Sequence, residues 1–317
     1  MATKGNVRAL PTFSFSGHET FVFRYGWLKK AYDAVRENPQ SFGDDQAIVT
    51  LGVGKNMVRS IRHWALATGV LAEEPKTRGM QLCTTPLADF LFGSAGHDPY
   101  LEDPNTLWLL HWNLLSNRQR CTTWFWAFYM LSANEFTRDG LMQSITEEMR
   151  RSDVGAPNEN TLRRDVEVFV RCYVPARAAR GVVIEDSLDC PLAELNLIEE
   201  DEGPGSVYRI RRGPKPGLND HVFAFALADF WERVAPDRES MAFSEIAYAT
   251  GGPGNGFKLD ENSLIERLER LEFLTNGELS YTETAGLKQV YGRLSKDKLG
   301  YLAQYYETTN PLFVVTA

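Results

Sequence analysis

The sequence has few of the side chains that form metal clusters or disulfide frameworks. Its 317 residues include four cysteines and five histidines, and no two cysteines form a C-x-x-C pair. Since no histidine stands near them at metal-ligand spacing either, neither a zinc site nor a disulfide framework is indicated. No apolar run approaches the roughly 18 residues of a membrane span, and the N-terminus has no apolar signal-peptide core. These absences predict a soluble, cytoplasmic protein.

The motifs of familiar phosphodiester and nucleotide chemistry are also absent. The sequence has no P-loop, no G-x-G-x-x-G after a predicted strand, no H-E-x-x-H and no G-x-S-x-G. Its net charge of −8 argues against a protein that coats nucleic acid nonspecifically. A net charge averages over local patches, however, so the basic residues are better judged by their positions.

Apolar and aromatic residues are plentiful enough for a stable core. Hydrophobic residues make up 43% of the chain and aromatic residues 12%, and domains of roughly 150 residues predict two or three units. We predict a mainly α fold of tandem winged helix-turn-helix-like modules with short β-hairpins on an aromatic helical scaffold. The predicted units are an N-terminal winged-helix DNA-binding module (1–95), a helical scaffold with a second helix-turn-helix-like unit (96–180), and an acidic and basic hairpin with a C-terminal winged-helix-like module (181–317).

Residues 44–93 carry the clearest pattern of secondary structure. Asp44 or Asp45 can cap a short helix, which two glycines break, and a second helix follows over 56–68. Next come a short strand, the polar turn EEPKTRG and the returning strand MQLCTT. The order helix, tight turn, helix and two-stranded hairpin predicts a winged helix-turn-helix.

The second helix of this module has one apolar face and one basic face. Met57, Val58 and Ile61 follow helical spacing on the apolar face, together with Ala65 and Leu66. The residues predicted to face DNA are Lys55, Asn56, Arg59, Arg62 and His63 on the helix, and Lys76 and Arg78 at the tip of the hairpin. The alternative is a solvated helix face in a module that contacts only protein.

The middle of the chain combines an aromatic segment with a basic helix. Residues 107–131 crowd seven aromatic side chains into two short helical runs. Exposed rings there would stack on single-stranded bases, but aromatics among leucines on a helix usually form a core, so we predict a scaffold. Residues 138–174 predict two helices around the turn SDVGAPNEN, and Arg163 and Arg164 on the second helix could grip a phosphate backbone.

The C-terminal segment repeats the pattern with a different surface. In residues 244–292, Asp260 caps a helix that has a leucine stripe, and Asn276-Gly277 predicts a tight hairpin turn. The outer face of this helix mixes acidic and basic side chains. This mixture favours a structural or protein-binding role over contact with DNA.

A cluster of polar residues precedes the first module. His18 beside Glu19, with Arg24 at a helical distance, can transfer protons and stabilise phosphate charge. The alternative is a buried hydrogen-bonded cluster that fixes this segment against the hairpin. A second polar group, in the loop 97–103, could bind a divalent ion, although acids in proline-rich loops usually cap helices.

Two stretches carry a resemblance to a known family. FSGHETFVFRYGWLKKA, residues 15–31, and LGVGKNMVRSIRHWALATGVL, residues 51–71, closely resemble the start of the bacterial SspB-like family, which was long catalogued as a domain of unknown function. Its members occur in the SspA to SspD systems, which place phosphorothioates on one strand of DNA and help defend against phage. The matching polar positions are His18, Glu19, Arg24, Trp27, Lys29 and Lys30.

The resemblance implies a component that binds double-stranded DNA and nicks one strand. His18, Glu19 and Arg24 are then the candidate catalytic residues, and Mg²⁺ is the expected ion, with ligands that the sequence does not identify. The implied partner proteins are a cysteine desulfurase, an ATPase and a sulfur-transfer protein that resembles ATP pyrophosphatases. A homodimer would follow by analogy with twofold DNA sites. Two alternatives remain, a noncatalytic DNA-binding adaptor or transcriptional regulator and a protein-interaction scaffold without DNA contact.

Overall fold

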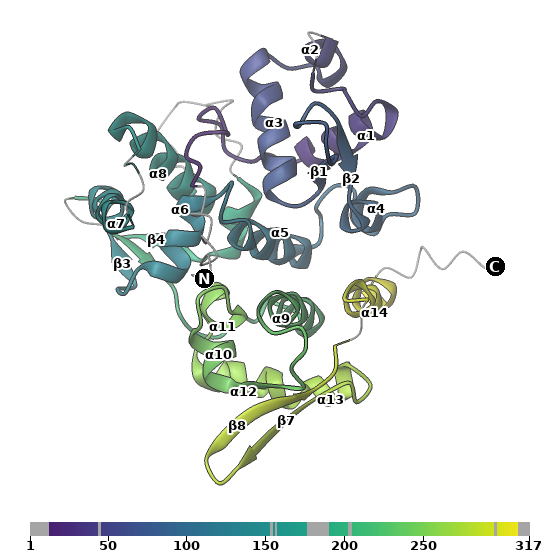
Figure 1. Ribbon diagram of the computed structural model, residues 1–317, viewed down its shortest axis with the longest axis vertical. Helices are drawn as coiled ribbons and strands as arrows, with labels where there is room; N and C mark the ends of the chain where they lie inside the picture. The colour runs from purple at the N-terminus through teal and green to yellow at the C-terminus, as the bar shows by residue number, and fades with distance from the viewer. Residues whose placement is uncertain are drawn as a thin grey trace, which may run out of the picture.

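The chain folds into helices and small antiparallel sheets, which confirms the mainly α prediction. The computed structural model describes residues 13–43, 46–152, 155, 157–175, 190–201, 205–294 and 297–309. Within these ranges no helix combines the length and apolar character needed to cross a membrane. The helices lie in three groups around the central helix α5 (Figure 1).

The first group contains the module predicted most clearly from the sequence. Its elements are α1 (Trp27–Glu37), α2 (Gln46–Leu51), α3 (Lys55–Ala67), β1 (Leu71–Glu73), β2 (Leu82–Thr84) and α4 (Pro86–Phe92). The strands pair antiparallel, with Leu71 opposite Thr84. The predicted order of helix, turn, helix and hairpin is therefore present, and Gly69, at φ 73°, turns the chain out of α3. The predicted cap at Asp44 or Asp45 lies outside the described residues.

The central scaffold buries the aromatic segment. It consists of α5 (Pro104–Ser116), α6 (Thr122–Phe125) and the π-helical turn η1 (Trp126–Met130). Asp103 caps α5 through the N–H of Asn105, at 2.8 Å. All seven aromatic side chains are buried, namely Trp108, Trp112, Trp124, Phe125, Trp126, Phe128 and Tyr129. This burial confirms the scaffold prediction and leaves no exposed ring for stacking on bases.

The second group surrounds a three-stranded sheet. Its elements are β3 (Glu135–Phe136), α7 (Arg138–Arg151), α8 (Glu159–Tyr173), the 3-10 helix η3 (Pro191–Leu195), β4 (Ile198–Glu200) and β5 (Tyr208–Ile210). The strand order is β3-β5-β4. Ion pairs cross the sheet from Arg209 to Glu135 at 2.9 Å and from Arg211 to Glu199 at 2.8 Å. The hairpin β4–β5 pairs with β3 and therefore belongs to the same sheet as the strand that precedes α7 and α8. The predicted domain boundary at residue 180 would separate this hairpin from those helices.

The third group contains the C-terminal helices and a longer hairpin. Its elements are α9 (Asp220–Val234), β6 (Ser240–Ala242), α10 (Phe243–Tyr248), α11 (Pro253–Gly256), α12 (Glu261–Glu269), α13 (Leu271–Leu274), β7 (Leu279–Thr284), β8 (Leu287–Gly292) and α14 (Leu299–Thr309). Asp260 caps α12 as predicted, because its carboxylate accepts the N–H of Ser263 at 2.9 Å. The strand order is β6-β8-β7.

The predicted hairpin turn at Asn276-Gly277 is wrong. These residues end α13 and lead into β7. The turn between β7 and β8 is formed instead by Ala285 and Gly286, at φ 51° and 82°. Asn276 and Gly277 also have positive φ, at 50° and 84°, and a left-handed residue pair ends a helix as readily as it reverses a hairpin.

The second and third groups share one topology. In each, a short strand precedes helices and a hairpin, and this first strand pairs with the last strand of the hairpin. The first group has the same order of helices and hairpin. In the first group, the N–H of Leu82 in β2 donates to the carbonyl of Pro39 at 2.9 Å. Pro39 thus takes the position at which the first strand pairs with the hairpin in the other two groups. Among the described residues, the order of helices followed by a hairpin thus occurs in all three groups, and the three-stranded sheet occurs in the second and third groups.

Candidate nucleic-acid interface

His18 lies in the interior, at the centre of a tight turn. Ser16, Glu19 and Thr20 all have left-handed backbone, at φ 78°, 48° and 68°, and the His18 side chain is only 1% exposed. Its Nε2 is 2.8 Å from Oδ1 of Asp165, and its Nδ1 accepts the N–H of Thr20 at 3.1 Å. Both ring nitrogens are therefore engaged, and His18 belongs to a buried hydrogen-bonded cluster, although its partner lies on α8 and not on the hairpin.

Asp165 on α8 is the partner that organises this turn. Its carboxylate accepts hydrogen bonds from His18, from the N–H of Ser16 at 2.9 Å, and from the hydroxyl of Thr123 on α6. Asp165 is not among the site residues predicted from the sequence. Asp165 directly follows Arg163 and Arg164 in the sequence, yet its side chain is buried, at 3% exposure. A buried carboxylate needs several donors, and these three come from two segments far apart in the sequence, the opening turn and α6.

The prediction that His63 faces DNA is wrong. His63 is 7% exposed and lies edge-on to Trp64, with its ring centroid 5.8 Å from that of His18. The backbone of Gly17 covers it so closely that a Cβ added there would lie 2.3 Å from Nδ1 of His63. Burial, together with the neighbouring His18, lowers the pKa of His63 to about 3. The ring is therefore neutral near pH 7 and offers no positive charge to a phosphate.

Arginines from two helices flank the turn on the surface. Arg59 on α3 is 57% exposed at its side chain and lies 3.5 Å from the carboxylate of Glu19. From the other side, the exposed Arg171 on α8 donates to the carbonyl of Thr20 at 3.5 Å. The turn thus places a cation of α3 and a cation of α8 beside adjacent residues, Glu19 and Thr20.

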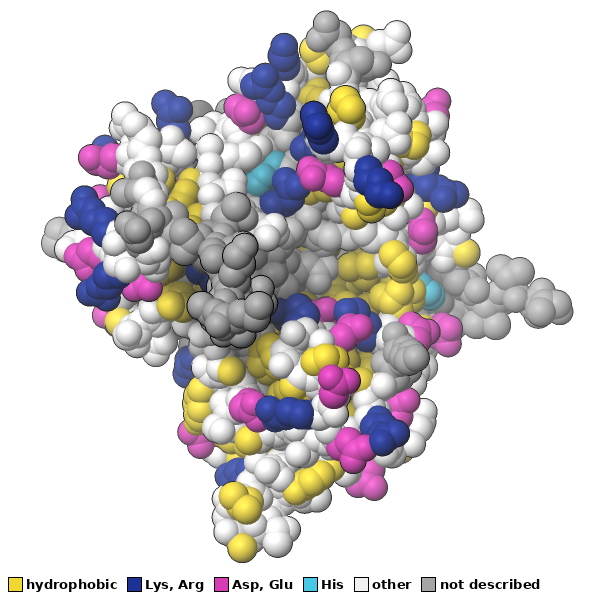
Figure 2. Space-filling view, viewed as in Figure 1, with side chains coloured by type: hydrophobic (Ala, Val, Ile, Leu, Met, Phe, Trp, Pro, Cys, Tyr) yellow, Lys and Arg dark blue, Asp and Glu magenta, His cyan; other side chains and the backbone are white. Residues whose placement is uncertain are grey.

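Further basic residues extend this surface along both helices. Lys55 and Asn56 are exposed at the start of α3, and Arg164 is exposed on α8. Arg163 is exposed as well but pairs with Glu159 at 2.7 Å. Lysine and arginine side chains lie over α3 and over α7 and α8 on the face drawn in Figure 2. We name the surface formed by Lys55, Arg59, Arg164 and Arg171 the two-helix basic surface.

Arg62 supports the hairpin loop. Its Nη2 lies 3.2 Å from Glu73 and donates to the carbonyl of Gly79 at 3.0 Å, and Arg120 reaches the same Glu73 oxygen at 2.8 Å. Burial alone would raise the pKa of Glu73, but the two arginines outweigh it and lower that pKa. Lys76 and Arg78, which were predicted to contact phosphate, are exposed in this loop. The hydrogen bond from Arg62 to Gly79 holds the loop in place.

The remaining polar positions of the opening motif have separate partners. Arg24 lies over the rings of Phe21 and Trp27, 5.9 and 5.5 Å from their centroids, in a cation–π arrangement. Lys29 pairs with Asp33 at 2.5 Å. Of the three predicted catalytic residues, His18 contacts Asp165, Glu19 contacts Arg59 and Arg24 contacts aromatic rings.

The acidic loop 97–103 caps a helix. Asp98 accepts the N–H groups of Glu102 and Asp103 at 2.8 and 3.1 Å, and the hydroxyl of Thr106 at 2.5 Å. Across the part of the chain that the structure describes, no group of three histidine, cysteine or acidic residues could hold a metal ion. The capping alternative is therefore confirmed for this loop.

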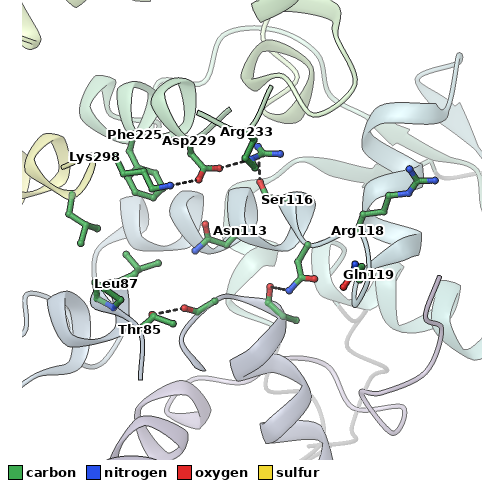
Figure 3. A pocket seen from close by; sticks show the side chains of 15 residues that line it. Thr85, Leu87, Asn113, Ser116, Arg118, Gln119, Phe225, Asp229, Arg233 and Lys298 are labelled. Atoms are coloured by element: carbon green, nitrogen blue, oxygen red, sulfur yellow. Dashed lines mark hydrogen bonds and ion pairs between the residues drawn. The ribbon is translucent and has the colours of Figure 1, made fainter. Parts of the chain in front are cut away.

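A cavity of about 730 Å³ lies between α4, α5, α9 and the start of α14 (Figure 3). Asp229 accepts from Lys298 at 2.7 Å, from Arg233 at 3.2 Å and from Trp112 at 3.0 Å. Three donors thus occupy its carboxylate. Sequence patterns did not indicate this cavity because its lining comes from five separate segments.

We expect the Asp165 contacts to dominate the stability of this junction. Replacing Asp165 with alanine leaves His18, Ser16 and Thr123 without their acceptor, at a cost of about 3–5 kcal/mol in the free energy of unfolding. Glu167→Ala, on the exposed face of the same helix, is the matched control and should cost within about 0.5 kcal/mol. Urea titrations followed by tryptophan fluorescence measure both. Equal costs for the two variants would contradict the assigned role of Asp165.

Comparisons with known proteins identify the family. A family model described as a protein of unknown function, DUF4007, matches residues 15–306. A crystal structure of magnesium ion-bound SspB is 34% identical, with a TM-score of 0.85 over 95% of this chain and 91% of that chain. A second SspB crystal structure is 32% identical, with a TM-score of 0.84 over the same shares. A comparison with curated proteins found no match. Because the family model spans nearly all of the described residues, the chain belongs to the SspB-like DUF4007 family.

Proposed function

We propose that this protein is a DNA-binding component of a bacterial phosphorothioation system, and that it contacts duplex DNA through the two-helix basic surface and the β1–β2 loop. The similarity to SspB supports membership of such a system. The observation that carries the DNA contact is the position of Arg59 and Arg171 on either side of one turn. A duplex crossing this turn would meet cations from both helices.

The repeated topology supports reading each group as a winged-helix unit. In such units the second helix of the helix-turn-helix enters a DNA groove, and the hairpin reaches the backbone. This assigns α3 and α8 to DNA contact. The corresponding helix of the third group is α12, where Arg267 is buried and binds Asp220, while Glu261, Glu266 and Glu269 are exposed. We therefore assign α12 a structural or protein-binding role.

Charge substitutions test the duplex contact. The exposed cations of the surface and the loop are Lys55, Arg59, Lys76, Arg78, Arg164 and Arg171. About six phosphate contacts predict a slope near −5 for log affinity against log salt concentration. Arg59→Ala with Arg171→Ala should weaken binding at least about tenfold and reduce the slope by roughly 2. The matched control is Arg238→Ala with Arg293→Ala in the third group. Equal losses in both double variants would count against this surface.

Magnesium-dependent nicking of one strand is the activity that we assign to the bound complex. The magnesium-bound relative favours this ion, and Mg²⁺ usually takes one or two carboxylates together with phosphate oxygens. Glu19 fits this donor set, because its carboxylate lies at the surface beside Arg59 and is 35% exposed. Bound there, Mg²⁺ would polarise the phosphate and activate water. His18 and Asp165 would position the turn that carries Glu19.

Supercoiled plasmid distinguishes nicking from binding alone. We expect open-circular product with Mg²⁺, none with EDTA, and at least about a hundredfold slower conversion by Glu19→Gln, since charge stabilisation at a phosphate contributes about that much. Glu74→Gln, an exposed acid of the hairpin loop, is the control and should nick normally. Plasmid that stays supercoiled although it is bound would identify a noncatalytic adaptor. The cysteine desulfurase, the ATPase, the sulfur-transfer protein, a homodimer and a cytoplasmic location stay predictions.

A further inference from the structure

The hairpin loop between β1 and β2 covers a second cavity, of about 630 Å³. One wall is the segment 38–43 and the other is the loop 76–82, while Arg62 of α3 closes one side. A cavity of several hundred Å³ is the usual size of a small-molecule or cofactor site. The cavity borders α3, the helix that we assign to duplex contact.

Hydrogen bonds hold both walls in place. The N–H of Leu82 donates to the carbonyl of Pro39 at 2.9 Å and joins the two walls. Within the loop, the N–H of Met80 donates to Thr77 at 3.1 Å, and Arg62 donates to the carbonyl of Gly79 at 3.0 Å. Gly79, at φ 77°, has conformational freedom that a larger residue would lack. The cavity is therefore preformed.

The lining combines three kinds of contact. Lys76 and Arg78 supply positive charge, and neither forms an ion pair with another residue in the described ranges. Phe42, which is half-buried, and Met80, which is 69% exposed, supply apolar surface. Gln40 and Gln81 supply amide groups. Cations bind phosphate, apolar rings stack on bases, and amides bind base edges. Together these contacts suit a nucleotide.

We propose that this cavity receives one unpaired nucleotide of the bound DNA. The proposal rests on the proposed function, because Arg62 connects the cavity to the helix that would contact the duplex. Taking a base out of the helix costs a few kcal/mol, and a pocket that stacks it offsets this cost. The cavity would hold one strand apart from its complement, beside the surface where Glu19 lies. The DNA substrate that fits this cavity is therefore a duplex in which at least one base pair is opened.

The experiment compares two short duplexes that differ by one nucleotide. One carries 2-aminopurine as a single-nucleotide bulge, and the other carries it paired. We expect the bulged duplex to bind about tenfold more tightly, with a change in 2-aminopurine fluorescence as the base stacks. Met80→Ala and Phe42→Leu should each reduce this preference to less than about threefold, and Phe42→Leu, which lies outside the β1–β2 loop, should keep its affinity for the paired duplex within about twofold. Phe42→Leu keeps an apolar side chain in the partly buried position but removes the ring.

Tyr100→Ala is the control, because Tyr100 is also an exposed aromatic residue, at 66%, and does not line the cavity. It should keep the full preference for the bulged duplex. Equal affinity of the unmodified protein for both duplexes would overturn the nucleotide site and leave the duplex contact standing. If both cavity variants keep the full preference for the bulged duplex, the nucleotide site is overturned as well. Failure to bind either duplex would overturn this inference together with the proposed function.

Discussion

The contact between His18 and Asp165 joins parts of the chain that are 147 residues apart in sequence, with 2.8 Å between the paired atoms. Neither side chain reaches solvent, so removing one partner would leave the other buried without its hydrogen bond. Asp165 also binds the backbone of Ser16 and the hydroxyl of Thr123. α8, α6 and the opening turn are therefore fixed relative to one another. The relative placement of Arg59 and Arg171 depends on this junction.

The aromatic scaffold supports the junction from within. The His18 ring lies near Trp64 of α3 and Trp124 of α6, with centroid distances of 6.1 and 6.4 Å. Both tryptophans are fully buried, and interiors of this kind are packed as densely as organic crystals. The scaffold therefore holds the first and second groups as one rigid surface. A DNA duplex bound at such a surface, as proposed, would require little ordering of the protein.

Local patterns predicted most of the helices, while contacts between distant segments accounted for the failures. The helices 138–151 and 159–173 could be predicted because caps and apolar spacing are properties of neighbouring residues. His63 was misplaced because helical periodicity does not reveal that Gly17 covers one flank of α3. Asp165 was missed for a similar reason, since its three donors come from two distant segments, the opening turn and α6. The cavity beneath the hairpin loop requires Pro39 to meet Leu82, a contact that no local pattern encodes.

The central claim is that α3 and α8 bind one DNA molecule together across the opening turn. Hydrogen exchange with and without duplex DNA measures this directly. We predict that peptides covering α3, residues 16–25 and α8 become protected together, and that α12 and the hairpin β7–β8 do not change. Protection of α3 without α8, or protection concentrated in the third group, would contradict the account.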